Sequence, residues 1–104
     1  MKSKIVELKS NEKYVRLLAG KPETAGLKSG FVTLQIAETV GEHKTEGKEE
    51  AIIILEGTAD VVIAGKVAHV VPAPAVVYIP PETIHDIRNT GNIPLRYVYV
   101  TSAV

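Results

Sequence analysis

The segment GEHKTEGKEE, residues 41–50, gathers several ionisable side chains directly ahead of the apolar run Ala51–Leu55. An imidazole nitrogen and a carboxylate oxygen each bind first-row metal ions at about 2.0–2.2 Å, so His43 and Glu50 could supply two ligands of a metal site. Charge-rich segments between strands also commonly lie in solvent. Two interpretations therefore stand for this segment, a metal site and a solvated turn.

A β-hairpin is the element that we expect to position these groups. If VGEHKT is a strand and EGKE is a four-residue turn, Glu50 begins the return strand opposite Thr45. His43 then lies opposite Ile52. Diagonal neighbours in a hairpin are about 7–8 Å apart, so His43 and Glu50 can converge on one point.

A second polar segment, VVYIPPETIHDIRNTG, carries another histidine near a turn. His85 follows the pair Pro80 and Pro81 at the start of an expected strand, and Asn89 comes four residues later. His69, in KVAHVV, is interpreted as a surface or edge histidine. His85 is a second histidine that could join the first segment.

Composition limits the class of protein that presents these residues. A chain of 104 residues with 45% hydrophobic content suits one domain with a single core. There is no cysteine, which excludes thiolate metal sites and disulfides, and we expect a cytoplasmic location. No run approaches the roughly 20 apolar residues of a membrane-spanning helix, so we expect neither a signal peptide nor a membrane segment.

Charge is distributed unevenly along the chain. Residues 1–30 carry a net charge of +4, residues 31–60 carry −5, and the remainder carries +1. The acidic excess surrounds the segment GEHKTEGKEE. A balanced total without a basic stripe lacks the electrostatic pattern of a nucleic-acid binder, so we expect no nucleic-acid partner.

Hydrophobic periodicity predicts many short strands and no long amphipathic helix. The expected strands are rich in Val, Ile and Tyr: KYVRLLA, FVTLQIA, AIIIL, ADVVIAG, KVAHVV, AVVYIP and LRYVYVT. Turns that contain Gly or Pro separate them. This spacing is typical of an all-β sandwich or barrel.

The strand AIIIL also predicts an assembly. Ile52 and Ile54 share one face of the strand, while Ala51, Ile53 and Leu55 share the other. Because both faces are apolar, we expect the strand to be covered twice, by the barrel interior and by a second sheet or a partner subunit. The expected assembly is a homodimer.

The two polar segments together resemble the motifs of a small single-domain cupin, G(x)5HxH(x)3–4E(x)6G and G(x)5PxG(x)2H(x)3N. The matching residues are His43, Glu50 and Gly57 around residues 41–57, and Pro80, His85 and Asn89 around residues 80–89. The resemblance covers residues 37–104 well and the first 36 only by strand pattern. It implies an all-β fold for residues 1–104, a closed antiparallel double-sheet jelly-roll barrel.

In cupins the metal is typically held by the three motif histidines and the glutamate. The resemblance therefore implies that His43, Glu50 and His85 bind one divalent ion, which could be iron, manganese, zinc, nickel or copper. Thr45 stands at the position of the second motif histidine. A neutral hydroxyl is a poor ligand for such ions, so we expect Thr45 to line the substrate pocket or to bind a water molecule.

Other positions depart from the cupin pattern or compete with it. Ala37 and Pro74 stand where the first glycine of each motif would be, and Glu82 replaces the glycine that follows the motif proline. Glu49 could replace Glu50 as the ligand, but the six residues between Glu50 and Gly57 favour Glu50.

Two classes of function follow from this resemblance. The first is a metal-dependent enzyme that acts on a small molecule inside the barrel, with oxygenase- or isomerase-type chemistry. The second is a non-enzymatic protein that binds a small ligand and keeps only a weak or vestigial metal site. No catalytic residue beyond the ligands is assigned, and Tyr97 and Tyr99 could border the pocket or belong to the core.

Overall fold

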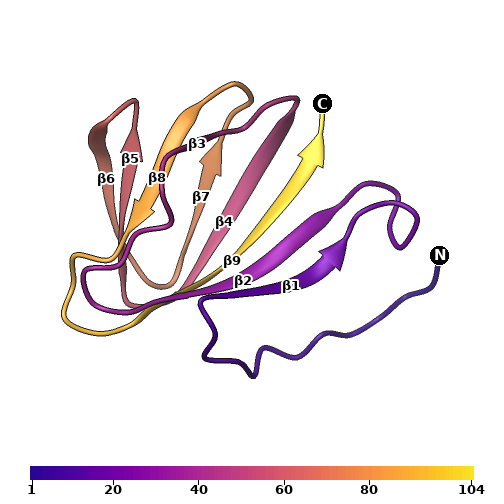
Figure 1. Cartoon of the computed structure of the whole chain (residues 1–104), viewed down its shortest axis with the longest axis horizontal. Coiled ribbons are helices and arrows are strands. Elements are labelled where there is room, and N and C mark those ends of the chain that lie inside the picture. Colours follow the sequence, from indigo (N-terminus) through magenta and orange to yellow (C-terminus); the bar gives the residue numbers. More distant parts are fainter.

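The computed structural model describes residues 1–104, and all of its regular structure is β (Figure 1). Nine strands follow one another along the chain: β1 (Tyr14–Ala19), β2 (Lys28–Leu34), β3 (His43–Lys44), β4 (Lys48–Glu56), β5 (Thr58–Ile63), β6 (Lys66–Pro72), β7 (Ala75–Ile79), β8 (Ile84–Arg88) and β9 (Leu95–Ala103). The structure has no helix of the length and apolar character that crossing a membrane requires.

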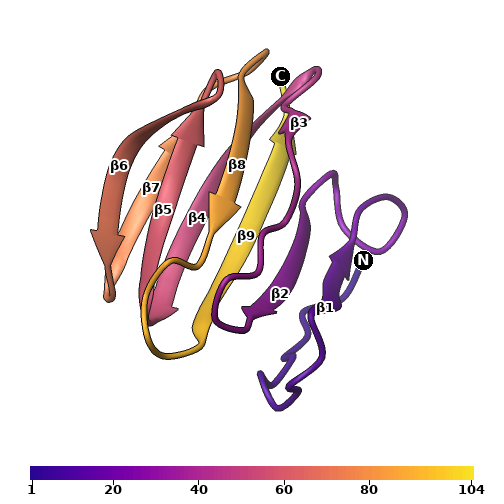
Figure 2. The ribbon, with the colours of Figure 1, turned by 60° about the vertical axis from the view of Figure 1, so that its left-hand side comes forward.

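The strands form two antiparallel sheets that face each other as two layers (Figure 2). One sheet has the order β1-β2-β9-β4-β7, and the other has the order β3-β8-β5-β6. The predicted all-β double-sheet fold is therefore confirmed. The prediction that the barrel is closed is wrong. β1 and β7 are the free edges of one sheet, and β6 and the two-residue strand β3 are the free edges of the other.

The core lies between the two sheets, and the period of two along each strand fills it. Ile52 and Ile54 of β4 are buried on the inner face, as AIIIL predicted for one of its two sides. They pack with residues from both sheets, including Val32, Val61 and Ile87. Each large aliphatic side chain buried in this way contributes about 1.5–3 kcal/mol to folding.

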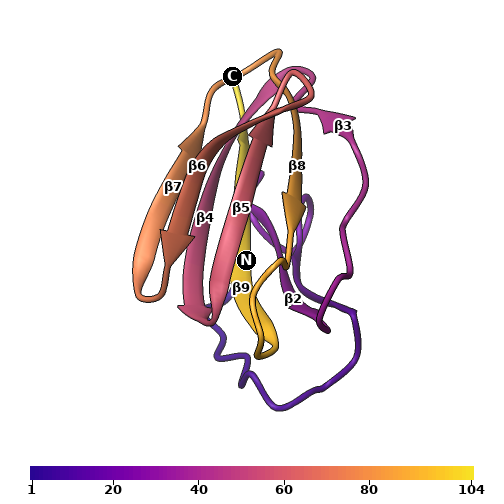
Figure 3. The ribbon, with the colours of Figure 1, turned by 90° about the vertical axis from the view of Figure 1, so that its left-hand side faces the viewer.

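Tight turns join neighbouring strands and fix their register. The hairpin of β5 and β6 closes through Ala64 and Gly65, whose positive φ angles of 50° and 82° fit a two-residue turn of the mirror-image type. Figure 3 shows the next turn, which carries the chain from β6 in one sheet to β7 in the other. Gly57 separates β4 from β5 at φ 84°, and a Cβ there would lie 2.6 Å from the carbonyl oxygen of Pro94. Gly57 is therefore required for two reasons: a side chain would clash with the backbone of Pro94, and the positive φ angle favours glycine.

The predicted hairpin, in which VGEHKT pairs with a return strand that begins at Glu50, is wrong. β3 pairs with β8, where His43 lies opposite His85, whereas β4 pairs with β7 and β9 in the facing sheet. The chain therefore crosses from one sheet to the other between β3 and β4. The turn at Gly47 suggested a local hairpin, but contacts of Thr45 with a distant turn prevail over that local signal.

Thr45 joins this crossing segment to the turn that precedes β8. Its hydroxyl donates to the carbonyl oxygen of Pro80 at 2.7 Å and accepts from the amide of Thr83 at 3.0 Å. Its carbonyl oxygen accepts from the amide of Glu82 at 2.7 Å, and its own amide donates to Thr83 at 3.2 Å. Thr45 is fully buried. The segments that carry His43 and His85 are thereby held side by side.

Two residues that replace motif glycines adopt the backbone conformation that glycine favours. Ala37 has a φ of 70° and Glu82 has a φ of 56°. Such angles are costly for residues with a Cβ. The side chain of Glu82 offsets part of that cost, because it accepts from the amide of Gly47 at 2.8 Å and pairs with Lys44 at 3.3 Å. These contacts lower the pKa of the Glu82 carboxyl below its ordinary value.

The side of β4 that faces away from the core forms an apolar surface with its neighbours. Val76, Ile53 and Val98 lie side by side across β7, β4 and β9. The next row adds Tyr78, Ala51 and Val100, and we call these six residues the outer apolar face. Val76 is 69% exposed and Tyr78 is 58% exposed. Only one of the two apolar sides of AIIIL is thus covered within the chain, and the homodimer stays a prediction.

Thr45→Val should destabilise the protein, because it removes the hydroxyl that links two segments and leaves the amide of Thr83 and the carbonyl of Pro80 without that partner. We expect a loss of about 1–3 kcal/mol in the free energy of unfolding, measured by urea denaturation. Thr90→Val, at an exposed position, is the control and should cost less than about 0.5 kcal/mol. A Thr45→Val protein as stable as the wild type would show that the crossing does not depend on this hydroxyl.

Light scattering at micromolar concentration should show a homodimer if a second copy covers the outer apolar face. Val76→Lys places a charge on that face and should weaken dimerisation at least tenfold, since an unpaired charge is costly to bury. Val67→Lys is the control, because Val67 is 51% exposed on β6 of the other sheet. A monomeric wild-type protein, or equal effects of the two substitutions, would contradict this interface.

Candidate metal centre

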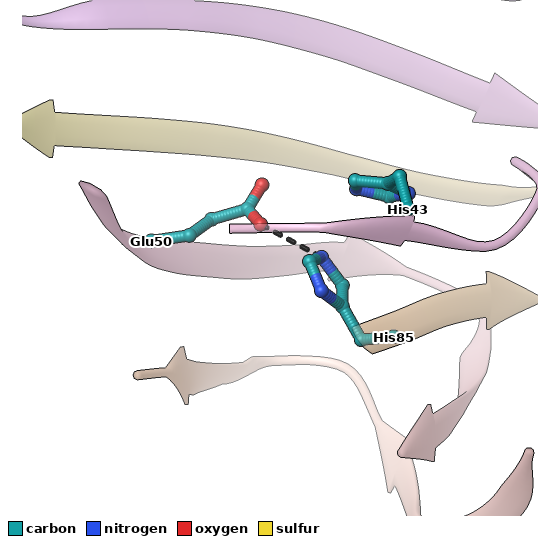
Figure 4. Close-up of side chains that lie close together, drawn as sticks. All are labelled: His43, Glu50 and His85. Carbon is teal, nitrogen blue, oxygen red and sulfur yellow. Dashed lines mark hydrogen bonds and ion pairs between the residues drawn. The ribbon is translucent and has the colours of Figure 1, made fainter. Parts of the chain in front are cut away.

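Three side chains from three strands converge between the sheets (Figure 4). His43 on β3 and His85 on β8 are directly opposed neighbours in the four-stranded sheet, and their ring centroids are 4.1 Å apart. Glu50 reaches them from β4 in the facing sheet. One ligand atom from each residue lies within 4.8 Å of the others. The structure thus brings together the three residues that the motifs indicated, through cross-sheet packing instead of a hairpin.

Backbone carbonyls orient both imidazole rings. The Nδ1 atom of His43 lies 2.9 Å from the carbonyl oxygen of Gly41, and the Nδ1 atom of His85 lies 3.0 Å from that of Thr83. A carbonyl oxygen can only accept a hydrogen bond, so each Nδ1 must carry the proton and donate it. In the neutral rings both Nε2 atoms then keep a lone pair, which is the arrangement that metal-binding histidines usually show.

Glu50 and His85 interact directly inside the protein. Nε2 of His85 lies 3.0 Å from Oε1 of Glu50, and both residues are buried. Burial by itself lowers the pKa of His85, but the hydrogen bond with Glu50, the carbonyl of Thr83 and the nearby negative charges outweigh it. The net effect raises the pKa of His85 above its ordinary value of 6.5. A cation, either a proton on His85 or a metal ion, is therefore favoured beside Glu50.

The donor set fits a first-row divalent ion. Two imidazole nitrogens and one carboxylate oxygen are ligands that zinc, iron and their neighbours accept, and the three atoms are close enough to share one ion. Glu49 does not join the set, since it faces the other side of β4 and accepts a hydrogen bond of 2.7 Å from Tyr78. His69 lies on β6, exposed and outside the site.

Thr45 is absent from the walls of the cavity at this centre, contrary to the expectation that it lines the pocket. Its hydroxyl is already bonded to Pro80 and Thr83, and no part of the residue is exposed. The residue in the place of the second motif histidine thus has a structural role. It holds the strand that carries His43 against the turn that leads to His85.

Asp86 positions His43 through the preceding loop, a role that sequence reasoning missed. Its carboxylate accepts from the hydroxyl of Thr39 at 2.9 and 2.7 Å, from the amide of Gly41 at 3.0 Å and from Arg88 at 3.2 Å. Burial would raise the pKa of Asp86, but these bonds lower it below its ordinary value. Because Gly41 also accepts from His43, the ionised carboxylate fixes the loop that orients this ring.

Asn89, the last residue of the second motif, is also structural. It is fully buried, and its side-chain amide donates to the carbonyl oxygens of Leu34 at 3.0 Å and Ile93 at 2.9 Å. Its side-chain oxygen accepts from the amide of Gly91. Asn89 therefore closes the loop after β8 and lies outside the metal centre.

A cavity of about 380 Å³ adjoins the three converging residues. Its walls are largely apolar or aromatic, formed by Val32, Val40, Ile52 and Ile87 and by Tyr14, Tyr97 and Tyr99. The polar side chains beyond the three converging residues are those of Glu42, Lys48 and Thr101. The sequence left open whether Tyr97 and Tyr99 belong to the pocket or to the core, and both line this cavity. Strong burial raises the pKa of Tyr97, so its phenol stays protonated.

Comparisons with known proteins agree with this fold and these motifs. Residues 30–101 match the profile of the cupin domain family. A comparison with curated protein sequences found no match. A crystal structure from Thermotoga maritima, described as a predicted oxalate decarboxylase, is 27% identical with a TM-score of 0.79, and the match covers 88% of this chain and 79% of that one.

Two further solved structures share the fold at lower identity. An RmlC-like cupin family protein from Methanocaldococcus jannaschii is 19% identical with a TM-score of 0.77, covering 99% of this chain and 93% of that one. A sugar phosphate isomerase of the cupin superfamily from Silicibacter pomeroyi is 16% identical with a TM-score of 0.64, covering 75% and 51%. Because the profile match spans more than half of the chain and includes His43, Glu50 and His85, this chain belongs to the cupin domain family.

Proposed function

We propose that this cupin binds one divalent transition-metal ion through His43, Glu50 and His85 and acts on a small molecule in the adjoining cavity. The observation that carries the proposal is the orientation of the two rings. Both Nδ1 atoms are committed to backbone carbonyls, so the two Nε2 atoms are the ones that can bind a metal ion beside a buried carboxylate, that of His85 in exchange for the proton that it shares with Glu50. The proposed chemistry is of the oxygenase or isomerase type.

A divalent ion in this site would polarise a substrate oxygen as a Lewis acid, and three protein ligands would leave coordination positions for that oxygen. The other walls serve binding. Val32, Ile52 and Ile87 would exclude water from one side of the bound substrate, and the protonated phenol of Tyr97 offers it a hydrogen-bond donor. Glu50 fixes His85 by a direct contact and so keeps the ligand set in place.

The relatives support a small, oxygen-rich substrate without identifying it. One is described as a predicted oxalate decarboxylase and another as a sugar phosphate isomerase. Oxalate and sugar phosphates share closely spaced oxygen atoms, which can reach a metal ion together. A cavity of about 380 Å³ lies near the lower end of the range for ligand sites, which suits molecules of that size.

Ligand binding without turnover is the second candidate function. It is favoured by the composition of the cavity walls, because the ionisable groups beyond the metal ligands are Glu42, Lys48 and tyrosines. Glu42 is exposed, and the phenol of Tyr97 is held in its neutral form. Quantitative recovery of an unaltered bound compound from metal-loaded protein would favour this function, whereas release of a changed product would favour catalysis.

His43→Ala should abolish stoichiometric metal binding while the fold persists, because His43 is exposed and contributes little to the core. Elemental mass spectrometry after reconstitution with zinc, manganese, iron, nickel and copper should find one equivalent of at least one metal in the wild type. His85→Ala should lose it as well, and His69→Ala is the matched control that should keep it. If both cavity variants keep the wild-type metal content, the histidines serve only the pocket and the site is vestigial.

In the metal-free protein, Glu50→Gln should lower the pKa of His85, since it removes the negative charge and the carboxylate acceptor that raise it. A histidine with a raised folded-state pKa stabilises the fold below its unfolded pKa of about 6.5, and this stabilisation is lost as the pH rises through the folded-state pKa. Glu50→Gln should therefore cost more unfolding free energy at pH 5 than at pH 8. NMR titration of the ring and urea denaturation measure the two effects, with Glu49→Gln as the control. A wild-type pKa below 6.5 for His85 would contradict the expected coupling.

A further inference from the structure

We propose that the cavity receives a small organic acid and that Lys48 binds its carboxylate. The inference rests on the proposed function, because a second oxygen of the same acid would lie at His43, Glu50 and His85. The substrate or ligand is then a carboxylate, and Lys48 determines specificity for it.

The position of Lys48 places a positive charge two residues along the strand from the proposed ligand Glu50. Lys48 begins β4, two residues before Glu50, and alternate residues of a strand share a face. Both residues line the cavity, as does Ile52 two residues further on. Two residues along a strand span about 6.6–6.8 Å, which a molecule of a few carbon atoms can bridge.

No acidic side chain neutralises Lys48. The six ion pairs of the chain all use other basic groups, and Lys48 makes no side-chain hydrogen bond. Its acidic neighbours along β4 have other partners: Glu49 faces outward to Tyr78, and Glu50 contacts His85. Several surface lysines are also unpaired, but Lys48 is the only lysine or arginine in the wall of the cavity.

The surroundings of Lys48 favour an anion over a neutral ligand. Lys48 is half-buried, and much of the cavity wall is apolar, so its charge is less screened than that of an exposed lysine. A divalent ion beside Glu50 would add a net positive charge to the same cavity. Carboxylate meets both requirements, because its oxygens pair with an ammonium group and also bind first-row metals.

The apolar walls define the rest of the ligand. Val32, Val40, Ile52 and Ile87 contact a body without charge, and the volume of about 380 Å³ limits that body to a short one. A short 2-oxo acid meets these requirements, because it combines a carboxylate, an adjacent oxygen donor and an aliphatic end. Such acids serve as probes of the proposed class.

Calorimetry with zinc-loaded protein tests the inference through binding, independently of any turnover. The probes are 2-oxobutanoate, 2-oxoisovalerate and oxalate, with 2-oxobutanamide as the uncharged counterpart. At least one acid should bind the wild type with a Kd of about 1 mM or lower, and about tenfold more tightly than the amide. Lys48→Met should weaken acid binding about tenfold or more and leave amide binding unchanged. Lys48→Arg should stay within about threefold of the wild type, since it keeps the charge.

Matched measurements separate this inference from the metal proposal. Zinc content and thermal unfolding are measured for every variant, and Lys66→Met, at an exposed position on β6, is the control that should bind acids as the wild type does. If Lys48→Met keeps zinc and binds acids as tightly as the wild type, the role of Lys48 is overturned and the metal site stands. Failure of every acid to bind zinc-loaded wild type overturns it as well.

If the wild type binds no zinc or other divalent ion, the metal proposal fails and the same titrations are run on metal-free protein. Acid binding that disappears in Lys48→Met would then uphold the anion site alone. Equal binding of acid and amide, or an absence of acid binding, would overturn it.

Discussion

The crossing of the chain from one sheet to the other between β3 and β4 is the constraint on which the candidate site depends. His43 and Glu50 are only seven positions apart in the chain, yet they reach the same point from facing sheets. The crossing is held by Thr45, whose hydroxyl and backbone are bonded to the turn at Pro80–Thr83. Because that turn leads directly into β8, the same contacts set His85 opposite His43. Hydrogen bonds between residues far apart in the chain thus hold the segments of His43 and His85 side by side.

The motif positions divide into residues that can bind an ion and residues that maintain the backbone. His43, Glu50 and His85 converge, whereas Gly57 and Asn89 meet steric and hydrogen-bonding demands elsewhere. The departures follow the same logic. Ala37 and Glu82 stand at motif-glycine positions and adopt a left-handed backbone, and the contacts of Glu82 with Gly47 and Lys44 give further support to the crossing. A residue other than glycine can therefore stand at a motif-glycine position in a left-handed conformation.

The sequence predicts the strands and the converging residues better than it predicts their pairing. The run AIIIL indicates a strand with apolar side chains on both faces, and the two motifs indicate His43, Glu50 and His85, because these signals are local. The partner of each strand is set by contacts far apart in the chain, so a turn signal at Gly47 wrongly predicted a hairpin.

The roles of pocket residues could not be predicted for a related reason. Thr45 and Lys48 lie on either side of the turn, and only the register decides which side chain enters the cavity. The structure places Lys48 in the cavity wall and commits Thr45 to backbone contacts. Asp86 escapes sequence analysis altogether, since its importance arises from a loop 45 residues away in the chain that reaches it by folding.

The buried carboxylate of Glu50 links stability to ligand choice at this site. An ionised carboxylate in an apolar interior requires a cationic partner, and His85 supplies one in its protonated form. A metal ion needs the same Nε2 lone pair that the proton uses, so proton and metal are alternative partners for one buried charge. Exchanging a single positive charge for a divalent one makes the cavity more positive, next to a lysine that already lacks an acidic partner. The occupant that best satisfies Glu50 is therefore also the one that strengthens the attraction of the cavity for an anion.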